Sequence, residues 1–211
     1  MRFSIKFLFI GLFFTLQSVS AMSKNIASEA SAVNPLLNGM PIPAVTLHYP
    51  DGTPVSLTAL TMHKPAIIMF YRGGWCPYCN QQFAELQTVE KDLVALGYQI
   101  LAISPQAPDA LQSQALESEM MVTQLSDVDV SAIREFGVGF YVDDKTAERY
   151  KTYNIELTKD ATGTPVLPAP AVFIVDKQGV VQFSYVNPDF KVRPSAALIK
   201  SVATVLAAEI K

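Results

Sequence analysis

Residues 65–79 read PAIIMFYRGGWCPYC, a continuous apolar run of strand length followed by two cysteines that lie three positions apart. An apolar run of this length indicates a strand that helices cover on both faces, as in a parallel sheet. Pro77 fits the first turn of a helix, so Cys76 falls at the helix N-cap. This stretch therefore predicts a buried strand, a tight loop and a helix that begins at the cysteine pair.

The segments on either side complete the prediction of an α/β fold with a mixed central sheet flanked by helices. Before the strand, two short extended runs surround Asp51 and Gly52, a dipeptide typical of a hairpin turn. After the cysteines, apolar residues recur every three or four positions, which predicts one long helix ending at Gly97. Further strands are expected at 99–104, 123–126, 171–175 and 180–186, and further helices at 105–118, at 128–136 and from Pro194 onward. Residues 139–168 show no clear period.

Length, composition and charge limit the class of protein. The chain has 211 residues, of which 50% are hydrophobic, so one compact domain is expected. Its 16 basic and 19 acidic side chains are close to balance, so no basic field is available to bind nucleic-acid phosphates. Nucleic acid is therefore not expected as a partner.

The N-terminus has the pattern of a secretory signal. Arg2 and Lys6 precede an apolar run at 7–16, and small residues lead up to Ala21, which predicts cleavage after Ala21. The run is shorter than the roughly 20 residues that span a bilayer, so no stable membrane insertion is expected after cleavage. We expect a signal peptide at 1–21, a flexible lead-in at 22–40 and the folded domain at 41–211. The protein is then exported, to the periplasm if the source is Gram-negative and otherwise by secretion.

The two cysteines predict redox chemistry. Unpaired N–H groups and the dipole at a helix start stabilise a thiolate, and in an exported protein a Cys76–Cys79 disulfide can persist. As a mere staple, so short a loop would contribute only about 2 kcal/mol. A zinc site needs four ligands, whereas the chain offers only His48 and His63 besides the cysteines. We therefore expect a redox-active dithiol, no metal and no other cofactor.

Four stretches carry a resemblance to a known family: PAVTLHYPDGTPVSL at 43–57, FYRGGWCPYC at 70–79, LSDVDVSAIREFGV at 125–138 and PAPAVFIVDKQGVVQFSYV at 168–186. Together they resemble the AhpC/TSA, or peroxiredoxin-like, branch of the thioredoxin superfamily, over nearly the whole mature chain. The resemblance implies a thioredoxin-like fold with the peroxiredoxin N-terminal β-hairpin and a helical insertion.

The active-site pattern departs from that of a typical peroxiredoxin, Pro-x-x-x-Thr-x-x-Cys. With Cys79 at the peroxidatic position, Arg72 replaces the proline and Cys76 replaces the threonine, while Pro170 stands where the family has a later arginine. In the family, that threonine and arginine orient the peroxide and stabilise charge as the O–O bond breaks, so their replacement argues against fast peroxide reduction.

The same residues match a different set in the superfamily. Cys76, Cys79 and Pro170 correspond to the Cys-x-x-Cys pair and the cis-proline of a thioredoxin. A cis Ala169–Pro170 bond would leave the backbone of Ala169 free to pair with an extended partner, and an ordinary trans proline is the alternative.

Supporting roles are expected for the residues next to the pair. Trp75 is interpreted as a packing platform, and Pro77 and Tyr78 as residues that tune the loop. Arg72 either lowers the pKa of a thiolate or meets a carboxylate of the partner, unless it is simply an exposed arginine at a strand end. Residues 189–193 resemble a solvated turn before the last helix.

The leading functional hypothesis is an exported thiol-disulfide oxidoreductase with a protein dithiol or disulfide as its partner. Cys76, expected to be the more exposed thiol, attacks or is attacked, and Cys79 resolves the mixed disulfide, although the roles can be reversed. The alternative is an antioxidant thiol-dependent peroxidase that reduces hydrogen peroxide or alkyl hydroperoxides through Cys79. A weaker alternative is a non-enzymatic copper carrier, which the lack of any histidine after His63 disfavours.

Overall fold

The computed structural model describes residues 24–62, 64–113 and 121–209. A seven-stranded sheet crosses the molecule in the order β2-β1-β5-β4-β3-β8-β9. Its strands are β1 (Thr46–His48), β2 (Pro54–Ser56), β3 (Ala66–Phe70), β4 (Gln99–Ser104), β5 (Val122–Ser126), β8 (Ala171–Val175) and β9 (Val181–Val186). β3, β4 and β5 are parallel to one another, whereas β1, β2, β8 and β9 join through antiparallel pairs. The predicted mixed sheet is confirmed.

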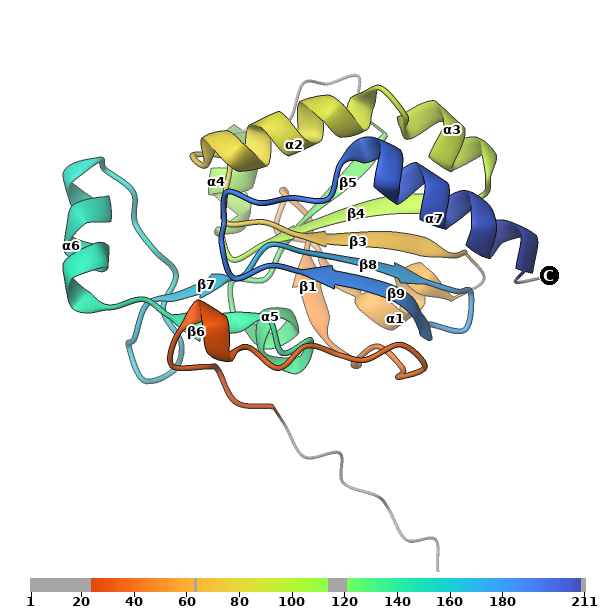
Figure 1. Ribbon diagram of the computed structural model, residues 1–211. Coiled ribbons are helices and arrows are strands. Elements are labelled where there is room, and N and C mark those ends of the chain that lie inside the picture. Colours follow the sequence, from red (N-terminus) through yellow and green to blue (C-terminus); the bar gives the residue numbers. More distant parts are fainter. Residues whose placement is uncertain (1–23, 63, 114–120, 210–211) are drawn as a thin grey trace, which may run out of the picture.

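Helices cover both faces of this sheet (Figure 1). On one face lie α2 (Pro77–Gln87), α3 (Glu90–Ala95) and α7 (Ala196–Glu209), and on the other lie α1 (Leu57–Thr61) and α5 (Ser131–Glu135). The short α4 (Pro108–Ser113) contacts β5. No helix among the described residues combines the length and the apolar character needed to cross a membrane.

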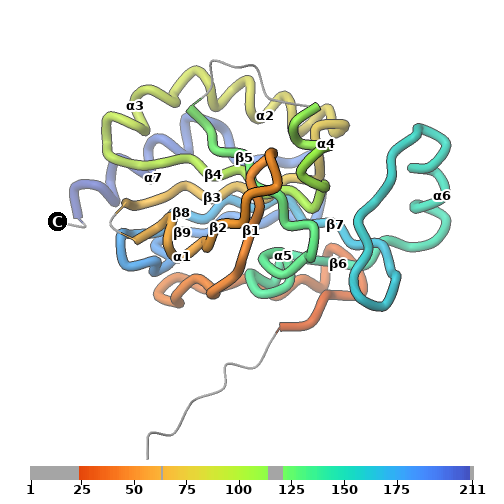
Figure 2. Tube along the Cα trace, turned by 180° about the vertical axis from the view of Figure 1, so that it is seen from behind, coloured from red at the N-terminus to blue at the C-terminus, as the bar shows by residue number. Residues whose placement is uncertain are grey.

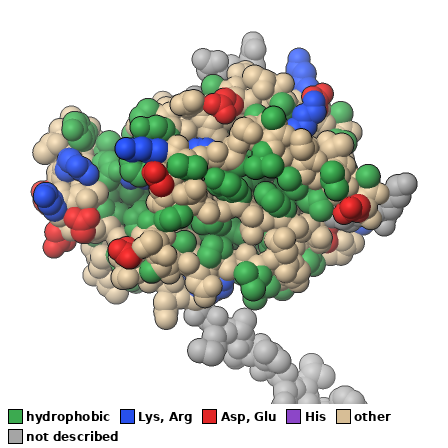
Figure 3. Space-filling model, viewed as in Figure 1, with side chains coloured by type: hydrophobic (Ala, Val, Ile, Leu, Met, Phe, Trp, Pro, Cys, Tyr) green, Lys and Arg blue, Asp and Glu red, His purple; other side chains and the backbone are tan. Residues whose placement is uncertain are grey.

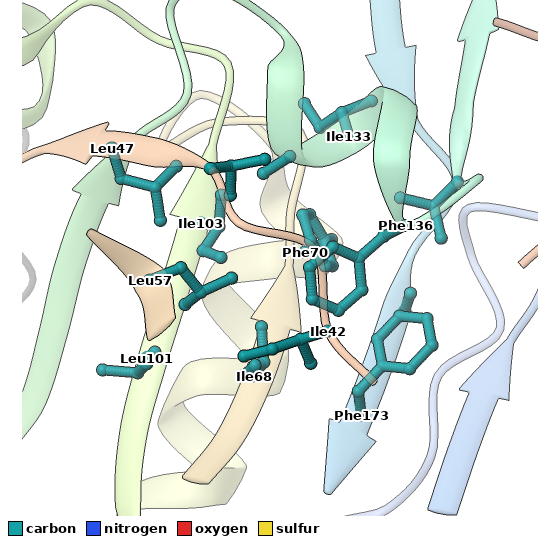
Figure 4. Packing of buried hydrophobic residues seen from close by; sticks show 14 of the residues in the cluster. Ile42, Leu47, Leu57, Ile68, Phe70, Leu101, Ile103, Ile133, Phe136 and Phe173 are labelled. Atoms are coloured by element: carbon teal, nitrogen blue, oxygen red, sulfur yellow. The ribbon is translucent and has the colours of Figure 1, made fainter. Parts of the chain in front are cut away.

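The buried strand β3 divides the core into two clusters, because successive side chains of a strand point to opposite faces. Ile68 and Phe70 belong to the cluster on the α1 and α5 face, while Ile67 and Met69 belong to the cluster that contains both cysteines. In the first cluster the rings of Phe70, Phe136 and Phe173 pack together, with centroids 4.8 to 6.0 Å apart (Figure 4). The cysteine helix is thus held on a sheet that is packed on both sides.

The long helix predicted after the cysteines is in fact two helices, α2 and α3. Thr88 ends α2, since its hydroxyl donates a hydrogen bond back to the Glu85 carbonyl oxygen at 2.7 Å. Val89, the N-cap of α3, has a φ of −120° and a ψ of −1°, which depart from the values of about −63° and −42° of a regular α-helix. Both residues are β-branched, which makes them weak helix formers. Gly97 ends α3 with a φ of +95°, as predicted.

An arm formed by residues 139–168 extends from the sheet beside the cysteine helix (Figures 1 and 2). It contains β6 (Gly139–Tyr141), α6 (Asp144–Thr152) and β7 (Val166–Pro168), and β6 and β7 pair as a separate two-stranded sheet. No residue of α6 is buried, so the helix leaves no apolar period in the sequence. This explains why the pattern of 139–168 predicts no element.

The described part of the expected lead-in, residues 24–40, packs on the domain. Ala27 exchanges two backbone hydrogen bonds of 2.9 Å with the β6 strand, and Leu36 is buried. Gly137 permits this approach, because a Cβ there would meet the Asn34 carbonyl oxygen at 1.9 Å. This packing differs from the flexible lead-in that the polar composition predicts. The predicted signal peptide, 1–21, lies outside the described residues.

Candidate active site

The cysteine pair lies where β3 passes into α2, as predicted. Cys76 is the N-cap of α2 and Pro77 begins the helix on the surface. The loop before them is tight, since a Cβ on Gly73 would meet the Trp75 Nε1 atom at 2.4 Å. The Gly74 N–H donates to the Gln106 side-chain oxygen at 2.8 Å, which ties the loop to the end of β4. The position of both sulfurs is therefore set by the sheet and by this loop.

Both cysteines are free thiols, and both are buried. Cys76 is 1% exposed and Cys79 is fully buried, so the expected difference in exposure between the two thiols is very small and neither lies open to solvent. The reason is packing: both belong to the apolar cluster beneath α2, and the half-buried Trp75 and Tyr78 lie against that cluster. A reactant must therefore reach the sulfurs through a gap between side chains.

The two sulfurs share a hydrogen bond that shifts the pKa values of the two thiols in opposite directions. The pKa of Cys76 is lowered to about 6, chiefly because its sulfur accepts a hydrogen bond from the Cys79 thiol, and the charges of Arg72 and Arg193 lower it further. The pKa of Cys79 is raised, because its thiol donates that bond and is buried. The shared hydrogen bond thus favours the loss of one proton from the pair and opposes the loss of a second.

Arg72 is buried rather than exposed at the strand end. Its guanidinium carbon lies 4.3 Å from the centre of the Phe190 ring, 5.2 Å from that of Trp75 and 5.5 Å from that of Tyr150. It donates a hydrogen bond to the Tyr150 hydroxyl, while its Nε has no partner among the described residues. This cation lies in an aromatic cage and lowers the pKa of Cys76, which supports the first of the two roles considered for Arg72.

Arg193 is the functional residue that the sequence interpretation missed. The segment before α7 was expected to be a solvated turn, but Arg193 is half-buried and donates from Nη2 to the Cys79 sulfur at 3.3 Å. Its Nη1 donates to the Gln82 side-chain oxygen and its Nε to the Phe190 carbonyl oxygen, both at 3.0 Å. No local motif marks such a residue, because the contact with Cys79 spans 114 positions of the chain.

Aromatic side chains link the cysteine loop to two other elements. Trp75 packs on Tyr150 of α6 with ring centroids 5.2 Å apart, and Tyr78 packs on Phe190 at 5.6 Å. Trp75 thus forms the packing platform that was expected, with α6 as its neighbour. On the face shown in Figure 3, hydrophobic side chains gather in a band across the middle, with charged side chains mainly toward its edges.

Pro170 lies at the predicted place but not in the hypothesised conformation. Ala171 is opposite Phe70 in the β3–β8 pairing, so Pro170 lies beside the start of the cysteine loop. No peptide bond among the described residues is cis, and the Ala169–Pro170 bond is therefore trans. Ala169 is buried, and its N–H donates to the Val138 carbonyl oxygen at 2.8 Å. The backbone N–H of Ala169 is thus occupied within the domain, which corrects the docking role suggested for it.

The side chains that could ligate a metal ion lie apart from one another in the described part of the chain. Among the described residues, no three His, Cys, Asp or Glu side chains are grouped to hold a metal ion. His48 belongs to β1, on the far side of β5 and β4 from β3, and His63 lies outside the described residues.

Comparison with known proteins gives a consistent result. The model of the AhpC/TSA family matches residues 39–184. A chloroplastic peroxiredoxin Q of Populus jackii is 25% identical over 197 residues, covering 90% of this chain and 82% of its own. Peroxiredoxin Bcp of Escherichia coli K12 is 31% identical over 106 residues, 50% of this chain and 67% of its own. In structure, reduced Prx3 of Vibrio vulnificus, crystallised with hydrogen peroxide, superposes with a TM-score of 0.64 at 17% identity, covering 80% and 96% of the two chains.

Proposed function

The chain belongs to the AhpC/TSA family, and we propose on this basis that it is a thiol-dependent peroxidase. In this proposal the Cys76–Cys79 dithiol reduces a hydroperoxide and an external dithiol restores it. The observation that carries the proposal is the arrangement of the pair: two free thiols lie three positions apart at the start of α2, and the Arg193 guanidinium donates a hydrogen bond to the Cys79 sulfur. The family relatives named peroxiredoxin support the same chemistry.

The reaction balances with the residues present. A thiolate attacks one peroxide oxygen, an S–O bond forms, the O–O bond breaks, and the leaving oxygen takes a proton to become an alcohol or water. The second sulfur then attacks the sulfenic acid, a disulfide forms and water leaves. Two thiols are oxidised and one peroxide is reduced. The external dithiol reduces the disulfide by exchange and completes the cycle.

The surroundings of the pair favour the first step. A thiolate is the reactive form of cysteine, and the lowered pKa of Cys76 keeps one present near neutral pH. Arg72 and Arg193 place two fixed positive charges at the sulfurs before any charge develops on the leaving oxygen. Preorganised charge of this kind lowers a barrier without further rearrangement.

Turnover with a small dithiol tests this function. The reduced protein, without residues 1–21, is mixed with hydrogen peroxide and dithiothreitol, and peroxide loss is followed against Cys76→Ser and Cys79→Ser. We expect the fastest continuous peroxide consumption by the unmodified protein, a slower one by the variant that keeps the attacking cysteine, whose sulfenic acid dithiothreitol reduces directly, and none above background by the other variant. Consumption equal to that of dithiothreitol alone would exclude the peroxidase function.

A thiol-disulfide oxidoreductase is the second candidate. It is favoured by the Cys-x-x-Cys pair at a helix start and by the lack of the peroxidatic threonine, whose position Cys76 takes. Reduction of the disulfides of insulin by the reduced protein distinguishes the two. Insulin reduction much faster than peroxide reduction would favour exchange as the main activity.

We also propose that the protein is exported, on the basis of the basic start, the apolar run at 7–16 and the small residues before Ala21. Its reducing partner is then an extracytoplasmic dithiol protein. N-terminal sequencing of the protein from fractionated cells tests this: a mature chain starting at Met22 outside the cytoplasm is expected. An intact Met1 in the cytoplasmic fraction would contradict export.

A further inference from the structure

We propose that Tyr150 of α6 is a positioning residue that keeps the loop at 71–75 closed over the cysteine pair, and that the reducing dithiol reaches the pair when this contact opens. The inference rests on the proposed function, because that dithiol is the reductant of the proposed cycle. It adds the element that controls the access of the reductant, which is the arm formed by residues 139–168.

Reduction of the disulfide needs more room than the closed structure provides. A thiolate of the dithiol attacks one sulfur of the Cys76–Cys79 disulfide, the S–S bond breaks, and the other sulfur leaves and takes a proton. The second thiol of the dithiol then displaces the mixed disulfide, so that the dithiol is oxidised and both cysteines are reduced. Each attack needs an accessible sulfur, but Cys76 is only 1% exposed and Cys79 is fully buried. Part of the surroundings must therefore move before a dithiol can react.

Tyr150 contacts the loop near both of its ends. Its hydroxyl accepts a hydrogen bond from the Arg72 guanidinium, and its ring packs on Trp75 with centroids 5.2 Å apart. The guanidinium carbon of Arg72 also lies 5.5 Å from the centre of the Tyr150 ring and 5.2 Å from that of Trp75. Because Trp75 directly precedes Cys76, the side chain of Tyr150 fixes the part of the loop that leads into the cysteine pair.

Among the helices near the pair, α6 has the least buried contact. It buries none of its residues, whereas α2 buries four and α7 buries two. Its N-terminus is capped within the arm, because the Asp143 carboxylate accepts a hydrogen bond from the Thr146 N–H at 2.9 Å. Segments with few buried contacts open at a lower free energy than the core does. The helix α6 can therefore move away from the loop while the sheet and α2 stay folded.

The burial of Arg72 makes the closed state sensitive to a single contact. Arg72 is 5% exposed, its Nε has no hydrogen-bond partner, and it belongs to neither ion pair among the described residues. Burial of a cation in this way costs free energy, which the aromatic contacts and the hydrogen bond to Tyr150 offset. When α6 moves away, the guanidinium returns to water. Loss of the Tyr150 hydroxyl should therefore shift the protein toward the open state.

The rate of disulfide reduction tests the role of Tyr150. The protein without residues 1–21 is oxidised with diamide, which forms the disulfide without peroxide. Dithiothreitol is then added, and the thiols that form are alkylated and counted by mass spectrometry. We expect Tyr150→Phe to raise the second-order rate constant about 10-fold, because loss of a hydrogen bond to a charged group enlarges the open population by about that factor.

Two further variants frame this result. Tyr150→Ala should raise the rate constant more than Tyr150→Phe does, since the contacts of the ring are lost as well. Tyr153→Phe is the matched control, because Tyr153 lies at the end of the same helix and is 66% exposed. Its rate constant should equal that of the unmodified protein. Circular dichroism and thermal unfolding establish that each variant is folded.

A double-mutant cycle tests whether Tyr150 acts through Arg72. In an Arg72→Met background, Tyr150→Phe should change the rate constant by less than about twofold, because the hydrogen bond it removes no longer exists. Tyr150→Phe alone should also move the alkylation of Cys76 by iodoacetamide to higher pH, since the guanidinium is no longer fixed beside the pair. Arg193 and the Cys79 thiol, which also shift the pKa of Cys76, are unchanged in this variant. A role of Tyr150 in stability alone would leave this pH profile in place.

The outcomes distinguish this inference from the proposed function. An unchanged reduction rate in folded Tyr150→Phe and Tyr150→Ala would overturn the role of Tyr150, and so would an equal effect of Tyr153→Phe. Undiminished effects of Tyr150→Phe in the Arg72→Met background would overturn its action through Arg72. If the reduced protein reacts with hydrogen peroxide no faster than a free thiol, the proposed function fails, while the disulfide formed by diamide still reports on the arm.

Discussion

Two helix starts in this molecule differ in how completely their buried polar groups are hydrogen-bonded. At α5, the carboxylate of Asp127 is 1% exposed and accepts hydrogen bonds from the Ser131 hydroxyl and from the Ala132 and Ile133 N–H groups, at 2.8 to 3.1 Å. At α2, the N-cap residue Cys76 makes no capping hydrogen bond with its side chain, and the nearby Arg72 keeps an unpartnered Nε. The carboxylate at the start of α5 thus has hydrogen-bond partners for both oxygens, while the start of α2 keeps a buried donor without a partner.

The contrast separates a structural group from a reactive one. Asp127 has its donors in place and fastens α5 to the end of β5, so nothing remains for a ligand. The cysteine loop, in contrast, buries the Arg72 guanidinium beside the cysteine pair. Arg72 takes part in neither of the two ion pairs found among the described residues. Unsatisfied buried groups cost stability, so the unpartnered Nε of Arg72 beside the two cysteines supports a chemical role for the start of α2.

The largest effect is expected from the cysteines themselves. Serine in place of the attacking cysteine should lower peroxide turnover by about 10³-fold or more, while serine in place of the other should lower it less, because dithiothreitol can reduce the sulfenic acid directly. Steady-state peroxide consumption measures this, and unfolding by urea should show only small changes in stability. If either serine variant turned over peroxide at the original rate, the start of α2 would not be the reactive site.

Asp127→Ala should show the reverse pattern. It removes the acceptor of two buried N–H groups, so we expect the free energy of unfolding to fall by about 2 to 4 kcal/mol. The rate constant for peroxide should stay within twofold at temperatures where the variant is folded. Urea unfolding and rapid mixing provide the two numbers, and a large loss of rate in the folded variant would contradict a purely structural role.

The pH dependence of stability sharpens the same contrast. Burial raises the pKa of Asp127 to about 6, in spite of the hydrogen bonds that lower it. The folded state therefore holds this proton more tightly than the unfolded chain, and the stabilisation is complete below about pH 4 and is lost as the pH rises through 6.

Relative to Asp127→Asn, which does not titrate, the unmodified protein should lose up to about 3 kcal/mol of stability between pH 4 and 7. Urea unfolding across this range measures the difference. A difference that is constant with pH would show that Asp127 keeps an ordinary pKa.

A smaller effect is expected from Arg72→Met, which removes the caged cation and keeps much of its volume. The pKa of Cys76 should rise, so thiolate formation should shift to higher pH and the rate at pH 6 should fall several-fold, with little change at pH 8. Alkylation by iodoacetamide against pH follows this shift. Arg149→Met, on the exposed side of α6, is the control. An equal shift in this variant would show that Arg72 has no specific effect on the pKa of Cys76.

The fold was predictable where the pattern is local. The apolar run of β3, the Asp51–Gly52 hairpin and the helix start at Cys76 and Pro77 all follow from neighbouring residues, and the structure confirms them. The arm at 139–168 was not, because α6 packs through few apolar residues and buries none of them completely.

The site divides in the same way. The cysteine pair could be predicted from its spacing alone, and the replacement of the family's arginine by Pro170 could be predicted from the resemblance. The contact of Arg193 with Cys79 and that of Tyr150 with Arg72 could not be predicted, since they join residues 114 and 78 positions apart. Such contacts depend on how α7 and α6 return to the sheet, which no local pattern specifies.

The central claim is that the start of α2 holds a dithiol that reacts with peroxide. The most direct measurement is rapid mixing of the anaerobically reduced protein with hydrogen peroxide at pH 7, followed by the fluorescence of Trp75, the single tryptophan, which lies at the site. The account predicts a second-order rate constant far above that of a free cysteine thiolate and one Cys76–Cys79 disulfide per peroxide. A rate no higher than that of free cysteine would contradict it.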